Sequence, residues 1–207
     1  MEIAIVLLAL VSNFLQLFFI IKGDVTVPRI SWIIWFVIIA ICFIINLLFE
    51  GWDTATIFFG SYTAGNMCIA GYVLAKNPSG WTTRETRLLT CVLIITLLWI
   101  PFEIIGREKT LVWATITSLV LLRIVHVIGV WEYWNKIWKD PFHESLWPWL
   151  LRWISALIAC IQILRHRSVY ISKSRMWISF SQPAYLWTTV CVTLFLILLQ
   201  RRRLKRT

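Results

Sequence analysis

Seven long apolar stretches, separated by short polar links, account for almost all of this 207-residue chain. Each approaches the length that a helix needs to cross the hydrocarbon core of a bilayer, roughly 20 residues at a rise of 1.5 Å per residue. In lipid the backbone amides must be satisfied within the segment, so such stretches fold as helices. The sequence therefore predicts an all-α polytopic membrane protein with seven transmembrane helices. The stretches are Ile3–Ile21, Ile30–Phe49, Thr54–Ala75, Leu88–Ile105, Leu111–Val130, Leu146–Leu164 and Ala184–Leu199.

Little of the chain remains outside these stretches, because hydrophobic residues make up 59% of it. The rest suffices for links but not for an added soluble domain, so residues 1–207 are expected to form a single membrane domain. Met1 and Glu2 supply no basic region before the first apolar stretch, so that stretch is expected to be retained as a helix. The five cysteines lie within the apolar stretches without a CxxC pair, which favours packing roles over redox chemistry.

The basic residues, which give the chain a formal net charge of +10, gather at the ends of the apolar stretches. If the N-terminus lies outside, the inner links and the tail Arg201–Arg206 hold about twice as many Lys and Arg residues as the outer links. The positive-inside rule then predicts an outside N-terminus and a cytoplasmic C-terminus, in the cell (inner) membrane. The lipid bilayer is therefore the expected partner of this charge, and nucleic acid is not.

Seven helices permit two triplets of the same orientation joined by a single helix. Shifting the chain by 117 residues places Lys22 on Lys139. The same shift places Trp32 on Trp149, so both triplets contain a helix, a basic residue, a proline-containing link and a helix that opens with tryptophan. The sequence thus predicts a 3+1+3 parallel-repeat arrangement. Its parts are the first unit 1–87, the linker helix 88–110 and the second unit 111–207 with the basic tail.

A polar motif marks the first triplet. The segment Asn13–Gln16 is followed by Lys22 and then by Pro28–Trp32, which opens the next helix with Ser-Trp. With these residues the chain resembles the PQ-loop, SWEET and SemiSWEET superfamily, and within it a bacterial seven-helix group with a Pro-x-x-Ser-Trp-x-x-Trp opening. The chain departs from the family pattern twice. Leu15 stands in place of the signature proline, and Glu132–Tyr133 replaces the Pro-Gln pair in the second triplet.

The resemblance implies a transporter in which two triplets rock about a central site near the midplane of the membrane. It implies a small polar metabolite, a sugar or an amino acid, as the small-molecule substrate, and no cofactor. Facilitated diffusion is favoured over ion coupling, since no carboxylate lies in the middle of an apolar stretch. A homo-oligomer is left open.

Asn66 is the first candidate for the substrate site, because it lies near the middle of the third stretch and stranding an amide in lipid is costly. Tyr62 and Thr63 share its face at helical spacing. A different face holds small residues, which would let another helix approach closely. They are Gly60, Ala64, Cys68 and Gly71. Two interpretations of Asn66 remain. It lines a substrate pocket, as SWEET-like sites use an asparagine on the third helix, or it fastens two helices by a hydrogen bond.

The tryptophans that open the second and sixth stretches, Trp32 and Trp149, are interpreted as residues of the interfacial belt. Trp35 and Trp153 lie one turn deeper. A sugar ring or another flat apolar face could stack on them, so they form a second tier of candidate substrate-binding residues.

Two further polar pairs are candidates. Asn13 and Gln16 share one face of the first helix, where helix–helix hydrogen bonding is the favoured interpretation and substrate binding the alternative. Arg123 and His126 lie three apart in the fifth stretch, where the pair could bind an anionic group or His126 could titrate during transport.

Two other charged residues are interpreted as structural. Arg152, in the first turns of the sixth stretch, is expected to extend its charge to the inner headgroups. Glu103, near the outer end of the fourth stretch, is expected to be a solvated helix terminus.

Catalysis has little support in the sequence. His126, His143 and His166 are far apart and lack metal-binding spacing, and no GxSxG, P-loop or close pair of mid-membrane carboxylates occurs. We therefore expect no enzyme. The rival function is a non-transporting membrane scaffold or partner-binding protein, which would use the tryptophan-rich end of the fifth helix and the basic tail.

Overall fold

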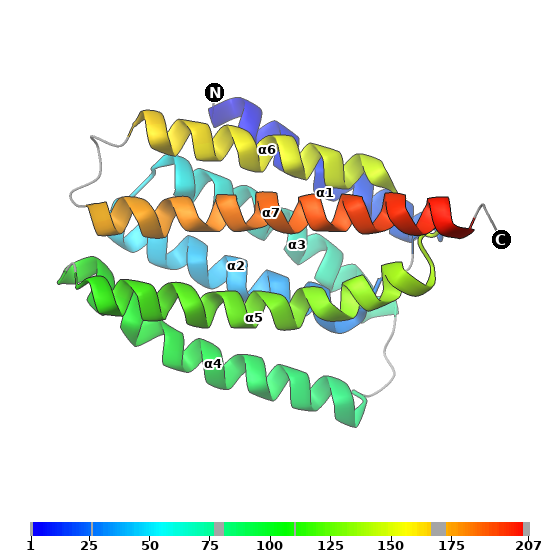
Figure 1. Ribbon diagram of the computed structural model, residues 1–207, viewed down its shortest axis with the longest axis horizontal. Helices are drawn as coiled ribbons and strands as arrows, with labels where there is room; N and C mark the ends of the chain where they lie inside the picture. Colours follow the sequence, from blue (N-terminus) through cyan, green and yellow to red (C-terminus); the bar gives the residue numbers. More distant parts are fainter. Residues whose placement is uncertain (1, 26, 77–80, 110, 167–172, 205–207) are drawn as a thin grey trace.

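The computed structural model describes residues 2–25, 27–76, 81–109, 111–166 and 173–204. Within these ranges the chain forms seven α-helices and no strand (Figure 1). All seven are long and apolar enough to cross a membrane, which confirms the prediction of an all-α polytopic membrane protein. The helices are α1 (Glu2–Lys22), α2 (Arg29–Glu50), α3 (Thr54–Lys76), α4 (Thr83–Glu108), α5 (Val112–Lys139), α6 (Leu146–Arg165) and α7 (Lys173–Leu204).

Several helices extend past the apolar stretches, because their polar ends are satisfied locally. α4 begins at Thr83, ahead of the predicted Leu88, behind a capping box. In this box the Thr82 hydroxyl accepts from the backbone N–H of Glu85 at 3.2 Å, and the Glu85 carboxylate accepts from the backbone N–H of Thr82 at 3.0 Å. α2 stops at Gly51, whose φ of +67° allows a tight turn into α3.

The extension of α5 is amphipathic. The apolar stretch ends at Val130, and the helix continues past it to Lys139. Along the extra turns Tyr133 and Ile137 are buried, whereas Trp138 is exposed. Packing of the buried side against the rest of the bundle explains why the helix continues after the apolar stretch has ended.

The seven helices run side by side along the long axis of the molecule, with α1, α3, α5 and α7 in one direction and α2, α4 and α6 in the other (Figure 1). α3 packs against both α1 and α2, and α7 packs against both α5 and α6. Across the middle, α1 packs on α6 and α5 packs on α2, while α4 lies against α5. If α1–α3 and α5–α7 are taken as two triplets, these contacts correspond in pairs. The correspondence is partial, because α3 also packs on α6, whereas the related pair, α7 with α2, makes at most weak contact.

Apolar side chains cover the outside of the bundle as well as its interior. Leu48, Leu97 and Phe195 are 76%, 69% and 63% exposed. Such exposure is expected where the surrounding solvent is lipid, because an apolar side chain then gains little from being buried in the protein. Inside the bundle, one cluster of buried aromatic side chains includes Trp32, Tyr133 and Trp149.

Of the predicted row of small residues on α3, Gly60 approaches a neighbour, with an added Cβ 3.1 Å from the Phe43 ring of α2. Ala64, Cys68 and Gly71 are exposed on the outside of the bundle, so that part of the prediction is wrong. The tight contact lies at Gly65, where an added Cβ would come within 2.3 Å of the side chain of Asn13 in α1. Small residues on the outer face have no helix to approach there, because α1 and α2 contact other faces of α3.

Candidate functional site

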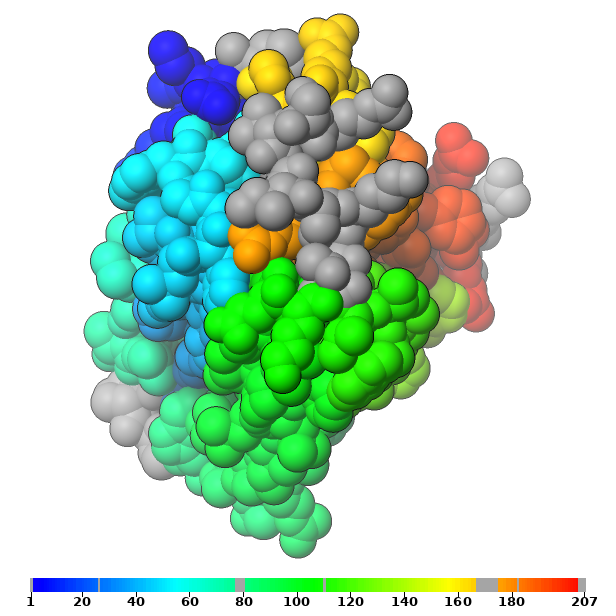
Figure 2. Space-filling view, turned by 90° about the vertical axis from the view of Figure 1, so that its left-hand side faces the viewer, coloured from blue at the N-terminus to red at the C-terminus, as the bar shows by residue number. Residues whose placement is uncertain are grey.

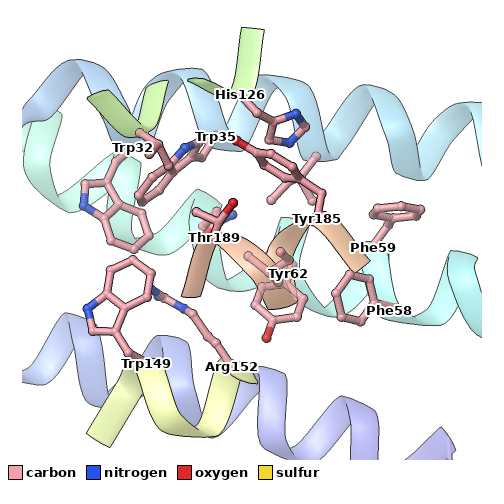
Figure 3. Close-up of a pocket in the computed structure, with 14 residues that line it drawn as sticks. Trp32, Trp35, Phe58, Phe59, Tyr62, His126, Trp149, Arg152, Tyr185 and Thr189 are labelled. Carbon is pink, nitrogen blue, oxygen red and sulfur yellow. The ribbon is translucent and has the colours of Figure 1, made fainter. Parts of the chain in front are cut away.

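A cavity lies in the middle of the bundle, where the two triplets meet (Figure 3). Its volume of about 50 Å³ holds a few water molecules. Helices α2, α3, α5, α6 and α7 contribute its walls, which are largely apolar and aromatic. The lining residues are Trp32, Trp35, Ile39, Phe58, Phe59, Tyr62, Asn66, His126, Val130, Trp149, Arg152, Tyr185, Leu186 and Thr189.

Arg152 is the one Lys, Arg, Asp or Glu residue of this described lining. Its side chain is buried, at 3% exposure, so the prediction that it extends to the headgroups is wrong. The guanidinium carbon lies 4.8 Å from the ring centre of Trp149 and 5.1 Å from that of Trp32 (Figure 3). Nη2 donates a hydrogen bond to Asn13 Oδ1 at 2.9 Å. Two indole rings and one amide thus hold the cation inside the bundle.

The Arg152 guanidinium forms no ion pair with a residue that the structure describes. Among the described residues its one hydrogen bond goes to the neutral Asn13, and no carboxylate lies within 4.0 Å. Glu144, a carboxylate in the same region, is engaged by other donors. Its oxygens accept from Lys136 Nζ at 3.2 Å, from Trp149 Nε1 at 3.0 Å and from the side-chain amide of Gln16 at 3.4 Å. A guanidinium has five N–H donors, and among the described residues Arg152 uses one of them on Asn13, so the others can serve water or a solute in the cavity that Arg152 lines.

Two pairs of lining residues are related by the 117-residue shift. Trp32 corresponds to Trp149, and both rings lie beside the guanidinium of Arg152. Arg152 itself corresponds to Trp35, so the second triplet carries a cation where the first carries an indole. The Trp35 ring stands 6.3 Å from the ring of Trp149, centre to centre.

The third helix of each triplet contributes a second set of related positions. A shift of 123 residues places Tyr62 on Tyr185 and Asn66 on Thr189, and all four line the cavity. Both helices thus present a tyrosine and, one turn later, a short hydrogen-bonding side chain. The residue of α7 that corresponds to Asn66 is thus a threonine and not a second asparagine. The shift of 123 residues exceeds the 117 residues of the earlier helices, and the link between α6 and α7 is longer than the link between α2 and α3.

Four of the predicted site residues line the cavity. They are Trp35, Tyr62, Asn66 and His126. The His126 ring packs against the Tyr185 ring at 4.8 Å between centres, and its Nδ1 lies 2.8 Å from the carbonyl oxygen of Leu122.

Two predicted residues, Asn13 and Gln16, lie behind the lining. Asn13 holds Arg152, and its Nδ2 donates to the carbonyl oxygen of Ala9 at 3.0 Å. Gln16 donates to Glu144. Asn13 therefore joins α1 to α6, as the favoured interpretation expects, and orients a lining residue, whereas Gln16 joins α1 to the turn before α6.

The remaining predicted residues, Thr63, Trp153 and Arg123, do not line the cavity. Trp153 donates to Cys191 Sγ at 3.1 Å and packs on another indole of α7, and Thr63 is half-buried outside the lining. The Arg123 guanidinium lies over the Tyr185 ring and donates to the carbonyl oxygen of Ser181 at 2.7 Å, beside a groove on the outside of α5. Arg123 and His126 both contact the Tyr185 ring, but of the two it is His126 that lines the cavity.

A buried polar network closes the end of the bundle where α4 turns into α5. Arg107, at 1% exposure, donates to Glu103 at 2.9 Å, to Glu50 at 3.1 Å and to Asn46 at 3.2 Å. The Ser118 hydroxyl of α5 donates to the other oxygen of Glu103. Glu103 is thus buried and paired, and the prediction of a solvated terminus is wrong. It is buried because α4 packs closely on α5 at this end.

The same end also includes α7, which begins at Lys173 and not at the predicted Ala184. Arg175 therefore belongs to a helix and not to a link. Its Nε donates to the carbonyl oxygen of Arg107 at 3.0 Å, and its Nη1 donates to that of Phe49 at 3.3 Å. Figure 2 looks onto this end, where the α4–α5 turn (green), the α2–α3 region (cyan) and the start of α7 (orange) lie against one another.

Polar contacts at the opposite end also join separate helices. Arg29 of α2 pairs with Glu85 of α4 at 2.6 Å. Glu144, just before α6, ties α1 to α5 through its contacts with Gln16 and Lys136. The cavity thus lies between two polar layers, one near each end of the bundle.

The described residues contain no group of three or more His, Cys, Asp or Glu side chains that could hold a metal ion. Comparisons of the chain with models of protein families, with curated proteins and with solved structures found no match.

Sequence reasoning missed several lining residues. Arg152 and Trp149 lie three apart on one helix face, and Trp32 is the repeat equivalent of Trp149. The spacing of Trp149 and Arg152, together with the repeat relation of Trp32 to Trp149, is the sequence signal that could have identified these lining residues. Tyr185 and Thr189 correspond to Tyr62 and Asn66 only under a shift of 123 residues, which differs from the 117-residue shift that relates the earlier helices.

Proposed function

We propose that this protein is a membrane transporter of SWEET or PQ-loop type for a small polar metabolite. Transport would be facilitative and would proceed by alternating access, with two triplets rocking about the central cavity. The observation that carries the proposal is the cavity lined by repeat-related positions of both triplets. Secondary transporters with internal repeats bind their substrates at such an interface, near the membrane midplane.

The polar layers at the two ends of the bundle fit this mechanism. Alternating access requires contacts that close one side while the other opens, and ion pairs between different helices can break and re-form as rigid units move. The layer of Glu50, Glu103 and Arg107 would close the outer side, and the layer around Glu144 would close the inner side. This assignment adopts the proposed orientation, with the N-terminus outside and the C-terminus cytoplasmic in the inner membrane.

Facilitated diffusion is the favoured mode. The described lining contains no carboxylate that could carry a proton or bind a sodium ion in the cavity. The scaffold alternative predicts a solid apolar core, whereas the lining includes Asn66, Tyr62 and Arg152. Polar side chains around a central space support transport over a purely structural role. We propose no catalytic activity.

Uptake into proteoliposomes tests the proposal. Vesicles containing the purified full chain would be given a mixture of sugars, amino acids and small organic acids, and their contents would be analysed by mass spectrometry. At least one solute is expected to enter faster than into protein-free vesicles. Asn66→Ala is expected to abolish this uptake without loss of thermal stability, because a cavity-facing amide contributes little to packing.

Met67→Ala is the matched control, since Met67 is the next residue of α3 and is 55% exposed on the outside of the bundle. It is expected to transport like the natural protein. If Asn66 only fastens two helices, its replacement would instead lower stability by about 0.6–2 kcal/mol with uptake intact. That result, or uptake no faster than in protein-free vesicles for every solute, would overturn the proposal.

A further inference from the structure

The cavity contains a buried positive charge and, in its described lining, no negative one, and this feature indicates the kind of solute it takes. We propose that the cavity binds small organic anions with a flat apolar body, whose carboxylate is held by Arg152. The inference rests on the proposed function and deepens it, because it names the substrate class of the same site.

The first argument is electrostatic. A guanidinium stays charged in proteins, and burying it without a counter-charge is unfavourable. Arg152 is 3% exposed, and its hydrogen bond from Nη2 goes to the amide oxygen of Asn13, which carries no net charge. The lining presents no Asp or Glu side chain to offset the charge. An anion that enters the cavity would therefore gain a direct charge–charge interaction with Arg152, whereas a neutral solute would gain none.

The surrounding charges do not remove this preference. Glu144 is the acidic side chain in this part of the bundle, and Lys136 already pairs with it at 3.2 Å. Trp149 and Gln16 donate to the same carboxylate. With these partners Glu144 forms no ion pair with Arg152 within 4.0 Å and attracts its charge only from a longer distance. Arg123 lies beside the groove on the outside of α5 and is itself a cation, so it does not offset the charge of Arg152.

The second argument concerns the donors that Arg152 has available. The contacts with Trp32 and Trp149 act on the positive charge through the ring faces and use no N–H donor. Asn13 accepts from one nitrogen. The guanidinium can thus offer a two-point contact to a carboxylate, which is the pairing that its planar fork favours. Three side chains hold the fork in place before a solute arrives, so little ordering is needed on binding.

The third argument comes from the rest of the lining. Trp35, whose ring centre lies 6.3 Å from that of Trp149, provides a large aromatic surface, and Phe58, Phe59 and Ile39 extend the apolar wall. Figure 3 shows the aromatic rings gathered around the cavity, with Arg152 at one side. A solute with a charged end and a flat apolar body matches this division. Asn66, also in the lining, offers an amide for a hydroxyl or an amine on the solute.

Ring compounds that differ in one substituent test the inference on the natural protein. The full chain in nanodiscs would be titrated with benzoate, benzamide, benzylamine and glucose. Binding would be followed by tryptophan fluorescence and by the shift in the midpoint of thermal unfolding. Benzoate is expected to bind saturably and at least about tenfold more tightly than benzamide, the difference set by hydrogen bonds to a charged group. Benzylamine and glucose are expected to bind more weakly still.

Variants then assign the effect to Arg152. Arg152→Gln is expected to remove the preference for benzoate over benzamide, and Arg152→Lys to keep part of it, since lysine retains the charge but not the planar fork. Arg84→Gln, at a side chain that is 70% exposed and outside the lining, is the control and is expected to bind benzoate like the natural protein. If Arg152→Gln does not fold, the comparison of benzoate with benzamide on the natural protein still decides the inference.

The outcomes separate this inference from the proposed function. Equal binding of benzoate and benzamide would overturn the inference. Uptake of a neutral solute that depends on Asn66, with no carboxylate bound, would overturn the inference and leave the transporter assignment standing. Absence of binding and of uptake for every solute would overturn both. A benzoate preference that survives in Arg152→Gln would place the anion elsewhere and would also overturn it.

Discussion

The contact between α1 and α3 provides a sharp test of the packing, because Gly65 leaves no room for a methyl group. A Cβ at this position would lie 2.3 Å from Asn13 Nδ2 and 2.5 Å from Cβ and Cγ of the same residue. Asn13 cannot simply turn aside, since it donates to Ala9 and accepts from Arg152. Gly65→Ala therefore has to separate α1 from α3 or break those hydrogen bonds.

The expected magnitude follows from these contacts. Overpacking a well-packed interior costs about 1–3 kcal/mol. Loss of the hydrogen bond between Asn13 and the charged Arg152 adds about 1.5–3 kcal/mol. The alanine at position 65 recovers about 1 kcal/mol of helix propensity. We expect Gly65→Ala to lower the free energy of unfolding by about 2–4 kcal/mol.

Two other glycines of α3 serve as controls. An added Cβ at Gly71 meets nothing within 4 Å, so Gly71→Ala is expected to leave the free energy of unfolding unchanged or to raise it by up to about 1 kcal/mol. At Gly60 the nearest atom is a ring carbon of Phe43 at 3.1 Å, which predicts an intermediate effect. Unfolding in mixed micelles with increasing SDS, followed by tryptophan fluorescence, measures all three. Equal stability of Gly65→Ala and Gly71→Ala would refute the packing described for α1 and α3.

Two further predictions concern the ends of the bundle and its orientation. Arg107→Ala leaves Glu50 and Glu103 buried without their cation and is expected to lower the free energy of unfolding by about 3–5 kcal/mol. Arg84→Ala, which removes an ion pair at a side chain that is 70% exposed, should change it by less than about 1 kcal/mol, and equal losses in the two variants would contradict the buried network. A reporter fused after Thr207 is expected to be cytoplasmic and one inserted after Asp53 non-cytoplasmic, and the opposite result would reverse the orientation and the assignment of the two polar layers.

The fold was largely predictable from the sequence, because lipid imposes a simple requirement. A stretch such as Ile30–Phe49 must be a helix if it crosses the membrane, and its length fixes its ends to within a turn or two. The ends that were wrong, at the start of α4 and of α7, are polar segments. There the helix continues for reasons of capping and packing that hydropathy does not register.

The site was predictable only in part, since the depth of a residue can be read from sequence but its neighbours cannot. Asn66 and Tyr62 were found because an amide in mid-membrane demands an explanation. Arg152 lies near a helix end, where a charge can usually reach the headgroups. What buries it is the position of Asn13 and Trp32 on other helices. Glu103 was misjudged for the same reason, because its burial depends on the packing of α5.

The choice between Trp149 and Trp153 shows a second limit of predicting the site from sequence. Trp149 and Trp153 are both on α6, one turn apart, and the deeper one was expected in the pocket. The structure places Trp149 in the lining and turns Trp153 to Cys191 on α7. The rotation of a helix about its own axis decides which residue faces the cavity. That rotation is set by the neighbouring helices and not by depth.

The most direct test of the central claim is whether the cavity opens alternately to the two sides of the membrane. Thr189 lines the cavity, and Val192, on the same helix, is 41% exposed on the outside of the bundle. With the five native cysteines replaced, Thr189→Cys and Val192→Cys would be exposed to a membrane-impermeant thiol reagent from either side of sealed vesicles. The account predicts that Thr189→Cys is modified from both sides and far faster than Val192→Cys. Modification of Thr189→Cys from neither side, or at the rate of Val192→Cys, would contradict it.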